Sequence, residues 1–504
     1  MLASLSLMSR VAPRVVPSSP FIRSFSNLPS KHEQADHDYA SRMQQLFDDN
    51  RPSLPRFVIQ GQCVKPILKP SRFYGEMKEH IQQAQKSITL AALYLGHTES
   101  DLVETLSEAL RSRPQLKVNL LLDSLRGTRD SGKGSSASLL YPLLKAYPKQ
   151  VRVSMYHTPD LSGVLKKIMP SRFNEGIGLM HMKVYAFDDT LIMSGANMSH
   201  DYFSNRQDRY IKFQNKDITE YYCDLVNTVS SFSYSLQDKG STFYLDMEAG
   251  VPDPVKQSIH FKNYATKSMR SFMKKWSNVQ QSPKDASFDT TLYPLLQMGP
   301  LGIRQDERVT LSVLDHVLHA AKQEGTSKAF ITSGYFNFER RYSNTIINSK
   351  AADVCLIAAS PEANGFFNSA GISQYIPPAY TLIEKRFFDA AKAAGNAERI
   401  KIEEYNRRGW TYHAKGLWVY PPQSEHPIMT TIGSPNFGYR SLVRDLEAQL
   451  FMVTKNLGLR KNLHEELCNL RRGSTQVTEE TFKAADRQVP LWVGGASEAI
   501  KTMM

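Results

Sequence analysis

The chain of 504 residues contains the same short motif twice, and this repetition constrains its fold more than any other feature. Each copy has a histidine, a lysine two positions later and an asparagine in a turn of small residues. The members are His181, Lys183 and Asn197 in the first copy, and His413, Lys415 and Asn436 in the second. The histidine and asparagine are 16 residues apart in the first copy and 23 in the second, and a polar insert at 421–427 accounts for the difference. A carboxylate, Asp208 or Glu447, follows each asparagine after a further 11 residues. Matched spacing of this kind indicates an internal duplication.

Short apolar runs of strand length precede both motifs. They occupy 88–95, 116–123 and 151–157 in the first half, and 328–336, 353–359 and 400–406 in the second. Amphipathic helical patterns alternate with the runs or follow them, at 77–85, 101–111, 309–322, 379–394 and 460–472. Strands that alternate with helices predict an α/β protein with two mixed, mostly parallel sheets flanked by helices. We expect one active site between the two halves.

The predicted organisation has four parts. They are a leader at 1–35, a first half at 36–240 that opens with a loose polar stretch, a linker with a basic amphipathic helix at 241–298, and a second half with a C-terminal tail at 299–504. The leader carries Arg10, Arg14, Arg23 and Lys31 and has no acidic residue before Glu33. This composition is typical of a mitochondrial transit peptide, and a disordered basic tail is the alternative.

The composition restricts the partners. The formal net charge of +13 favours an anionic partner, such as a phospholipid surface, a nucleotide or a nucleic acid. No apolar run reaches the roughly 18 residues that span a bilayer, so we expect any membrane contact to be peripheral. The four cysteines are widely spaced and form no CxxC pair, which argues against a structural zinc site or a disulfide framework. We expect no cofactor and no metal.

The repeated motif suits phosphoryl chemistry. In an extended strand, residues i and i+2 face the same side, so each histidine points with its lysine into one cleft. The lysines, with Asn197 and Asn436 as donors, stabilise charge on phosphate oxygens. One imidazole attacks phosphorus when it is neutral, and the other protonates the leaving oxygen when it is charged. Asp208 and Glu447 fit as carboxylates that orient the imidazoles.

The first copy continues to Asp188, giving HxKxxxxD, and both copies end in a Gly/Ser-x-Asn turn. This duplicated pattern resembles the phospholipase D superfamily over residues 56–455. The block 174–210 is more specifically similar to the mitochondrial phosphatidylglycerophosphate synthases of eukaryotes. The second copy departs from the superfamily pattern at Tyr420, where an Asp is usual, and the first at Ser194, where a Gly is usual.

The resemblance implies transfer of a phosphatidyl group from CDP-diacylglycerol to glycerol 3-phosphate, with release of CMP, through a phosphohistidine intermediate. The product leads to phosphatidylglycerol and cardiolipin. Catalytic roles for His181, Lys183, Asp188, His413 and Lys415 follow from the resemblance, as does His181 as the nucleophile. It also implies a place at the matrix face of the mitochondrial inner membrane.

A second cationic pocket is expected for the phosphate of the acceptor, because arginine suits bidentate phosphate contact. The candidate substrate-binding residues are Arg126, Arg129, Lys133, Arg206, Arg209, Arg407, Arg408, Arg440 and Ser434. The loop 124–137 either holds a phosphate or is simply solvated. Segments 159–176 and 261–280 mix apolar and basic residues, which fits a membrane-surface element, with a connector helix as the alternative for the second.

Other functions remain open. Serine or phosphatidylglycerol could replace glycerol 3-phosphate as acceptor. A mitochondrial nuclease or phosphodiesterase of the same superfamily would also suit the basic charge, although Asp188 argues against the tyrosyl-DNA phosphodiesterases, and we expect no nucleic acid partner. A non-catalytic lipid-binding scaffold would not need both His/Lys pairs. His316 and His319 are expected to lie on a helix face.

Overall fold

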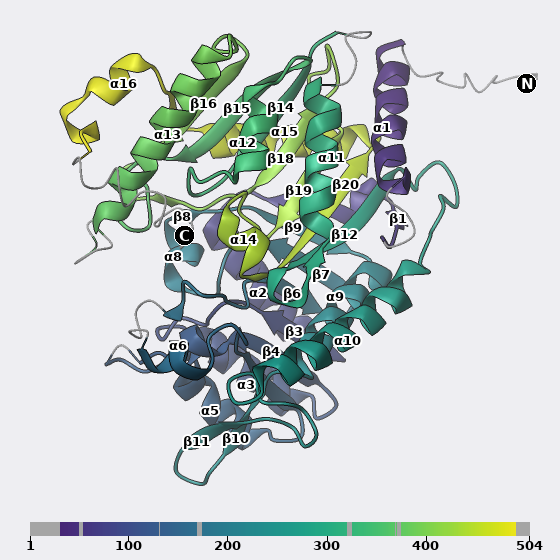
Figure 1. The fold of residues 1–504 in the computed structure, drawn as a ribbon. Helices are drawn as coiled ribbons and strands as arrows, with labels where there is room; N and C mark the ends of the chain where they lie inside the picture. Colours follow the sequence, from purple (N-terminus) through teal and green to yellow (C-terminus); the bar gives the residue numbers. More distant parts are fainter. Residues whose placement is uncertain are drawn as a thin grey trace, which may run out of the picture.

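A computed structural model describes residues 31–49, 54–130, 132–168, 174–319, 325–367, 369 and 374–489. Its two halves are stacked one above the other in Figure 1, each a β-sheet with helices on its faces. Most of the predicted leader, residues 1–30, lies outside the described residues, as does the end of the C-terminal tail from 490. In the part of the chain that is described, we find no helix long and apolar enough to cross a membrane.

The first sheet has the order β11-β10-β5-β4-β3-β6-β7-β9-β2. Its strands are β2 (Val64–Ile67), β3 (Ser87–Ala91), β4 (Lys117–Asp123), β5 (Val151–Tyr156), β6 (Val184–Phe187), β7 (Thr190–Ser194), β9 (Tyr210–Gln214), β10 (Tyr234–Asp238) and β11 (Phe243–Asp246). The accompanying helices are α2 (Pro70–Gln83), α3 (Ser100–Ser112), α4 (Ser124–Gly127), α5 (Ser136–Ala146), α6 (Gly163–Ile168), α8 (His200–Ser204) and α9 (Lys216–Ser230). Helix α3 buries Leu102, Leu106, Ala109 and Leu110, a spacing that keeps one apolar face on the sheet.

The second sheet has the order β1-β12-β20-β19-β18-β14-β15-β16-β21, with β13 beside β12. Its strands are β1 (Phe57–Ile59), β12 (Thr290–Met298), β13 (Ile303–Arg304), β14 (Ser327–Thr332), β15 (Ala352–Ala359), β16 (Ile400–Tyr405), β18 (Gly416–Tyr420), β19 (Met429–Gly433), β20 (Leu446–Thr454) and β21 (Ser474–Gln476). The helices are α1 (Lys31–Asp49), α10 (Ser258–Ser277), α11 (Gln305–His319), α12 (Arg340–Ile347), α13 (Ile376–Ala393), α14 (Tyr439–Val443), α15 (Leu457–Arg471) and α16 (Glu479–Lys483). Short 3₁₀ turns lie at Gly61–Cys63, Gly299–Leu301 and Ala485–Arg487.

Both sheets are mixed, as predicted, but the prediction that they are mostly parallel is wrong. Parallel pairing joins β3 to β4, β4 to β5, β14 to β15 and β15 to β16, and the other pairings within the two sheets are antiparallel. Each motif is followed by a β-hairpin, β6–β7 or β18–β19, and adjacent strands joined by a hairpin must run in opposite directions. Apolar runs identify such strands without revealing their direction.

The two sheets repeat one strand order, which agrees with the predicted duplication. The series β5-β4-β3-β6-β7-β9 corresponds to β16-β15-β14-β18-β19-β20. The registers match as well, because Ala91 pairs with Val184 in the first half and Thr332 with Gly416 in the second. Strands β6 and β18, which directly follow the His/Lys pairs of the two motifs, therefore occupy equivalent positions in the two sheets.

The boundaries of the halves differ from the prediction at both ends of the first half. Residues 36–49, predicted as a loose lead-in, belong to helix α1, which packs Met43 and Phe47 into the core of the second half. Strand β1 pairs with β12 of the second sheet, and β12 itself lies in the predicted linker. Strands β1 and β12, from the predicted first half and the predicted linker, therefore extend the second sheet beyond β20, and α1 packs in its core.

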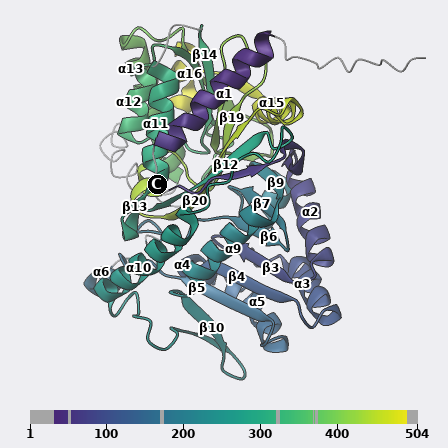
Figure 2. The same cartoon turned by 90° about the vertical axis from the view of Figure 1, so that its right-hand side faces the viewer.

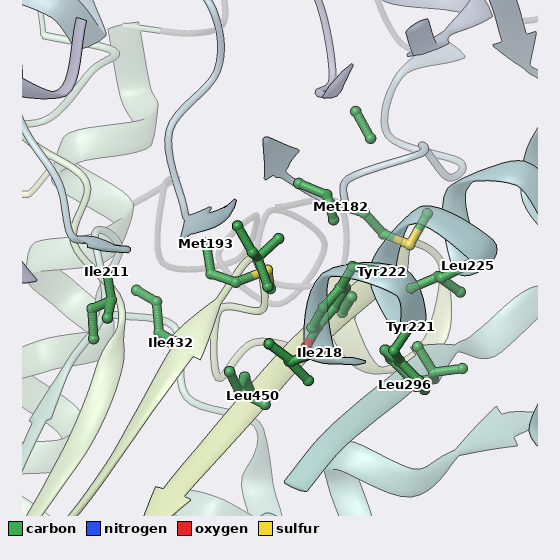
Figure 3. Packing of buried hydrophobic residues seen from close by; sticks show 14 of the residues in the cluster. Met182, Met193, Ile211, Ile218, Tyr221, Tyr222, Leu225, Leu296, Ile432 and Leu450 are labelled. Atoms are coloured by element: carbon green, nitrogen blue, oxygen red, sulfur yellow. The ribbon is translucent and has the colours of Figure 1, made fainter. Parts of the chain in front are cut away.

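An apolar core joins the two halves (Figure 3). Met182, Met193, Ile211, Tyr222 and further residues of the first half meet a group from the second half, namely Leu296, Ile432 and Leu450. A hydrogen bond from the Tyr222 hydroxyl to the Gln449 carbonyl crosses the same interface at 3.3 Å. Burial of this extent favours a fixed relative position of the halves.

Helix α10 belongs to this core along its C-terminal part. Phe272 and Trp276 are buried against Phe57 and Tyr221, and Lys275 forms an ion pair with Asp224 at 2.9 Å. The alternative of a connector helix therefore describes this part of 261–280. Its basic and aromatic composition reflects packing on one side and solvent on the other.

Candidate active site

The two motif histidines lie in extended stretches directly before β6 and β18. Because side chains alternate in an extended chain, Met180 and Met182 enter the apolar core while His181 and Lys183 face the opposite side. The second copy repeats this alternation: Tyr412 and Ala414 enter the core, and His413 and Lys415 face away from it. The expected pairing of each histidine with its lysine on one side therefore fits the structure.

Each histidine is held by the backbone of the other half. The His181 amide donates to the Leu446 carbonyl at 2.8 Å, and the His413 amide donates to the Gln207 carbonyl at the same distance. Leu446 and Gln207 occupy equivalent places, directly before the two carboxylates of the duplicated pattern. A short parallel pair, β8 (Arg206–Gln207) with β17 (Thr411–Tyr412), extends this contact. The motifs thus exchange main-chain partners across the interface.

The carboxylates are exchanged in the same way. His181 Nδ1 lies 3.0 Å from both carboxylate oxygens of Glu447, and His413 Nδ1 lies 2.7 Å from Asp208 Oδ2. A carboxylate at Nδ1 fixes the tautomer with its proton on that nitrogen, so Nε2 keeps a free lone pair. The carboxylate of each half therefore orients the imidazole of the other half.

The lysines close the chamber between the histidines. Lys183 Nζ donates to the His181 carbonyl at 2.6 Å, and Lys415 Nζ to the His413 carbonyl at 2.7 Å. Both ammonium groups are buried. Gly195 is needed here for space, because a Cβ at this position would lie 2.8 Å from Asp208 Oδ1 and 3.2 Å from Lys415 Nζ.

Burial dominates the electrostatics of the chamber. Desolvation lowers the pKa of both imidazoles well below the usual histidine value, and the neighbouring charges of Lys183 and Lys415 lower it further. Desolvation also lowers the pKa of Lys415 to about 8 and raises the pKa of Asp208 to about 6. Both histidines are therefore neutral at neutral pH, and an anionic ligand would favour their protonated forms.

The two motif asparagines brace the walls of the chamber. Asn197 accepts a hydrogen bond from the Leu93 amide at 3.2 Å, and its amide group lies 3.4 Å from the Tyr202 hydroxyl. Asn436 accepts from the Ser333 hydroxyl at 3.5 Å, at the equivalent end of β14. Ser434, an expected substrate-binding residue, is buried, and its hydroxyl donates to the Ala448 carbonyl at 3.4 Å and accepts from the Ala448 amide at 3.2 Å.

Asp188 lies away from the histidines, at the other end of β6. Its carboxylate accepts hydrogen bonds from the backbone amides of Gln85, Lys86 and Ser87 at 2.7 to 2.9 Å. This geometry fits a brace for the start of β3 and leaves no direct contact with the chamber. In the second half, the Tyr420 hydroxyl instead lies 3.0 Å from His464 Nδ1 of α15.

Two of the candidate arginines border the chamber. Arg206 lies 4.7 Å from the ring of Tyr202 and its charge lowers the pKa of His413. Arg440 pairs with Asp445 at 2.9 Å and its charge lowers the pKa of His181. One cation therefore stands beside each imidazole.

The other cationic candidates fall into three groups. Arg126 and Arg129 both pair with Glu175, at 3.0 and 2.6 Å. Arg407 covers the ring of Trp410 at 3.8 Å. Lys133 and Arg408 are exposed on loops.

Arg209 is a structural residue. It is buried, pairs with Glu466 of α15 at 2.8 Å and covers the ring of Trp418 at 3.8 Å. Two further hydrogen bonds join it to the carbonyls of Lys415 and Thr431. It therefore ties the first half to the second and has no donor left for a substrate phosphate.

Replacing Arg209 by methionine is expected to lower the free energy of unfolding by about 3 to 5 kcal/mol, because Glu466 then remains buried without a cation. Thermal and urea denaturation measure this change, with Arg407→Met as the exposed control. Adding Glu466→Leu to Arg209→Met should recover part of the loss. An equal effect of the control, or no recovery in the double variant, would contradict this role.

Sequence reasoning missed three residues beside the histidines. Tyr202 places its hydroxyl 3.4 Å from His413 Nε2, although the two residues come from different halves. Asp123 and Asp445 accept from the amides of Met180 and Leu179 at 2.9 and 2.8 Å and so fix the stretch that carries His181. No spacing rule marks these residues, but Asp123 ends a predicted strand, where ligand-binding residues often lie.

Among the described residues, His181, Asp445 and Glu447 form one group whose oxygen and nitrogen atoms lie close enough to share a cation. Each member already has a partner in the protein, since Glu447 holds His181 and Asp445 holds Arg440 and the Leu179 amide. The arrangement therefore fits a hydrogen-bonded support of the imidazole, and it gives no independent sign of a metal.

A pocket of about 660 Å³ opens beside the chamber, among the loops that follow β3, β4 and β7. Tyr94 and Ser199 form its inner wall, with 3.4 Å between their hydroxyl oxygens. Arg126 lies over the Tyr94 ring at 4.6 Å, and Arg129 is on the pocket rim. The pocket therefore provides an arginine-lined space close to the histidines.

The comparisons with known proteins agree with this geometry. Residues 77–228 match the model of the family described as "Cardiolipin synthase, PLD-like domain". The mitochondrial CDP-diacylglycerol–glycerol-3-phosphate 3-phosphatidyltransferase of Homo sapiens is 39% identical over 482 residues, which are 90% of this chain and 84% of the relative. The enzyme of the same name from Gallus gallus is 40% identical over 491 residues, with 90% of this chain and 85% of the relative covered.

The chain belongs to the CDP-diacylglycerol–glycerol-3-phosphate 3-phosphatidyltransferases of the phospholipase D superfamily. A phosphatidylserine synthase from Haemophilus influenzae Rd KW20 has the same fold, with a TM-score of 0.68 and 20% identity over 92% of this chain and 99% of that one. The predicted duplicated phospholipase D-like fold is confirmed by this likeness and by the repeated strand order.

Proposed function

We propose that the protein transfers the phosphatidyl group of CDP-diacylglycerol to glycerol 3-phosphate, giving phosphatidylglycerophosphate and CMP. The enzyme name shared by relatives about 40% identical over nine-tenths of the chain carries this proposal. The crossed His–carboxylate pairs supply chemistry that such a transfer requires. The reaction is a step towards phosphatidylglycerol and cardiolipin.

In the first step, His181 Nε2 attacks the phosphorus nearer to the diacylglycerol. The negative charges of the bound diphosphate and of Asp208 favour the protonated form of His413. The bond from the phosphorus to the bridging oxygen breaks, His413 gives its Nε2 proton to the departing CMP, and a phosphatidyl-histidine remains. His181 is suited to attack because burial keeps it neutral and Glu447 holds the proton on Nδ1. Lys183, Lys415, Arg206 and Arg440 surround the chamber and offset the charge of the diphosphate.

In the second step, His413 Nε2 removes a proton from a hydroxyl of glycerol 3-phosphate, and that oxygen attacks the phosphorus. The bond to His181 breaks, and the imidazole returns to its neutral form. Asp208 stabilises His413 while it is charged. Water must be excluded during this step, since hydrolysis would give phosphatidic acid, and both imidazoles are at least nine-tenths buried.

The pocket beside Tyr94 is the site we propose for the phosphate of the acceptor. Arg126 and Arg129 share one carboxylate, Glu175, so this group of three keeps a net positive charge. A phosphate dianion can engage both guanidinium groups in bidentate contacts. Lys133 follows in the same loop, 124–137, for which phosphate binding and a solvated loop are the two predicted alternatives.

Replacing Arg126 by methionine is expected to raise the KM for glycerol 3-phosphate about tenfold or more, because a charge-assisted hydrogen bond is lost. The KM for CDP-diacylglycerol should change much less. Steady-state kinetics with each substrate varied in turn measure both constants, and Arg111→Met on α3 is the exposed control. An unchanged acceptor KM in Arg126→Met and Arg129→Met alike would exclude this pocket.

The proposed activity has a direct test. The purified chain is incubated with CDP-diacylglycerol and, separately, glycerol 3-phosphate, serine or phosphatidylglycerol, and the lipid products are identified by mass spectrometry. Phosphatidylglycerophosphate with release of CMP is expected. Preferred formation of phosphatidylserine or cardiolipin would show that serine or phosphatidylglycerol is the acceptor. Cleavage of DNA without lipid transfer would contradict the proposed reaction.

The pH dependence of kcat/KM follows from two groups of the free enzyme. Asp208, with a pKa of about 6, must be ionised to hold His413, so activity is expected to fall below this value. Lys415, with a pKa of about 8, must be charged, so activity is expected to fall above this value. A bell-shaped profile between the two is the expected result. In Lys415→Arg the alkaline limb should move to higher pH. An alkaline limb that stays at the same pH would show that another group causes it.

The protein acts in the mitochondrion, as the names of its relatives indicate. We place it at the matrix face of the inner membrane, with residues 1–35 as the transit peptide. Protease treatment of mitochondria before and after rupture of the inner membrane tests this location. Degradation before rupture would contradict it.

A further inference from the structure

Exposed apolar side chains gather where α6 of the first half lies beside the N-terminal end of α10. Ile168 at the end of α6 and Ile259 near the start of α10 are each 74% exposed, and Tyr264, five residues further along α10, is 37% exposed. Figures 1 and 2 both show α6 beside the N-terminal end of α10. An ion pair of 2.5 Å between Lys262 and Asp160 ties α10 to the loop before α6.

Exposed basic side chains lie on the same two helices or next to them. Lys167 on α6, and Lys256 and Lys267 at α10, are exposed. Two nearby carboxylates are already engaged, since Asp160 pairs with Lys262 and Asp253 accepts from the backbone of Val255 and Lys256. The α6–α10 surface therefore presents exposed apolar and cationic side chains together, which is the composition that anionic lipid surfaces attract.

We propose that this α6–α10 surface, formed by Ile168, Ile259 and Tyr264 with Lys167, Lys256 and Lys267, is where the protein binds an anionic phospholipid bilayer. The apolar side chains enter the interfacial region, and the lysines contact lipid phosphates. The inference rests on the proposed function in one respect, because that function requires a lipid substrate.

The position of the surface supports a lipid partner over others. Helix α6 follows β5, whose carboxyl end lies at the same sheet edge as those of its parallel neighbours β4 and β3. The loops at this edge line the pocket beside the histidines, and Glu175, between α6 and His181, pairs with Arg126 and Arg129 of that pocket. A bilayer on the α6–α10 surface would therefore lie at the side of the first sheet where this pocket opens.

The structure moves the predicted membrane contact along the helix. Phe272 and Trp276, two aromatic residues of segment 261–280, for which a membrane-surface element is one of the two predictions, are buried in the core between the halves. The exposed apolar residues of α10 lie at its other end, beside the predicted segment 159–176. Substitution at Trp276 would therefore test stability, whereas Ile168 and Ile259 test binding.

The experiment compares the full chain with Ile168→Asp/Ile259→Asp and with Lys167→Gln/Lys256→Gln/Lys267→Gln. Leu457→Asp, at an exposed apolar residue of α15, is the matched control. Co-sedimentation is measured with vesicles of phosphatidylcholine, with and without phosphatidylglycerol. The isoleucine variant is expected to bind phosphatidylglycerol vesicles at least about tenfold more weakly, because two apolar side chains are lost from the interface. The lysine variant should lose mainly the preference for anionic vesicles, and the control should bind normally.

Transfer activity separates this proposal from the proposed function. The isoleucine variant and the lysine variant should both lose transfer activity on CDP-diacylglycerol in vesicles. Both should keep this activity on a short-chain CDP-diacylglycerol dispersed in detergent. Unchanged vesicle binding in both variants overturns the surface, as does an equal loss in Leu457→Asp. A change of oligomeric state without a change in vesicle binding would assign the surface to a second copy of the chain. If the unaltered chain transfers nothing from the short-chain substrate, the proposed function fails while vesicle binding still decides the surface.

Discussion

Replacing His181 by alanine is expected to lower phosphatidyl transfer at least about a thousandfold, because the enzyme then lacks the atom that forms the covalent intermediate. No labelled phosphatidyl-enzyme should accumulate when this variant is mixed with CDP-diacylglycerol labelled in the phosphatidyl group. The loss should not be a folding effect, since the imidazole lies at a chamber wall and is not part of the apolar core.

The matching variant His413→Ala is expected to lose overall transfer to a similar extent but to trap the labelled intermediate. CMP is a stable anion and can leave with less help from an acid, whereas the alcohol of the acceptor needs a base before it attacks. Gel filtration under denaturing conditions separates protein-bound label from free lipid. His316→Ala, on α11, is the control. Trapping in His181→Ala instead of His413→Ala would reverse the two roles.

The second large effect on transfer activity is expected from substituting Asp208 or Glu447, the carboxylates that each hold the histidine of the other half. Asp208→Asn should lower transfer by about a hundredfold to ten-thousandfold, because an amide no longer holds the tautomer or stabilises the charged form of His413. Glu447→Gln should do the same through His181. Both substitutions keep the size of the side chain, so the packing of the two halves should remain.

The intermediate distinguishes crossed pairing from pairing within each half. With crossed partners, Asp208→Asn should accumulate the labelled phosphatidyl-enzyme as His413→Ala does, and Glu447→Gln should form little of it. The reverse result would mean that each carboxylate serves the histidine of its own half. Asp315→Asn, at a carboxylate whose side chain is 77% exposed, is the control for loss of a negative charge.

Much of the fold could be predicted because local patterns are strong in this chain. The runs at 116–123 and 353–359 match β4 and β15 closely, and the helical pattern at 101–111 matches α3. The direction of each strand and the sheet to which it belongs were harder to predict, since both depend on pairing partners far along the chain. Residues 57–59 pair with β12, more than 200 residues away, and no local pattern of three residues specifies such a partner.

The sequence by itself determined that two His/Lys pairs exist, that each faces one side of an extended stretch and that two carboxylates follow at matched spacing. Those properties come from chain periodicity and composition, which act over a few residues. Only the tertiary structure decided that Glu447 serves His181 and Asp208 serves His413, that Arg209 is a structural residue, and that Asp188 lies away from the chamber. Such pairings arise when an apolar core fixes two halves against each other, and its geometry is set by burial over the whole chain rather than by any one segment.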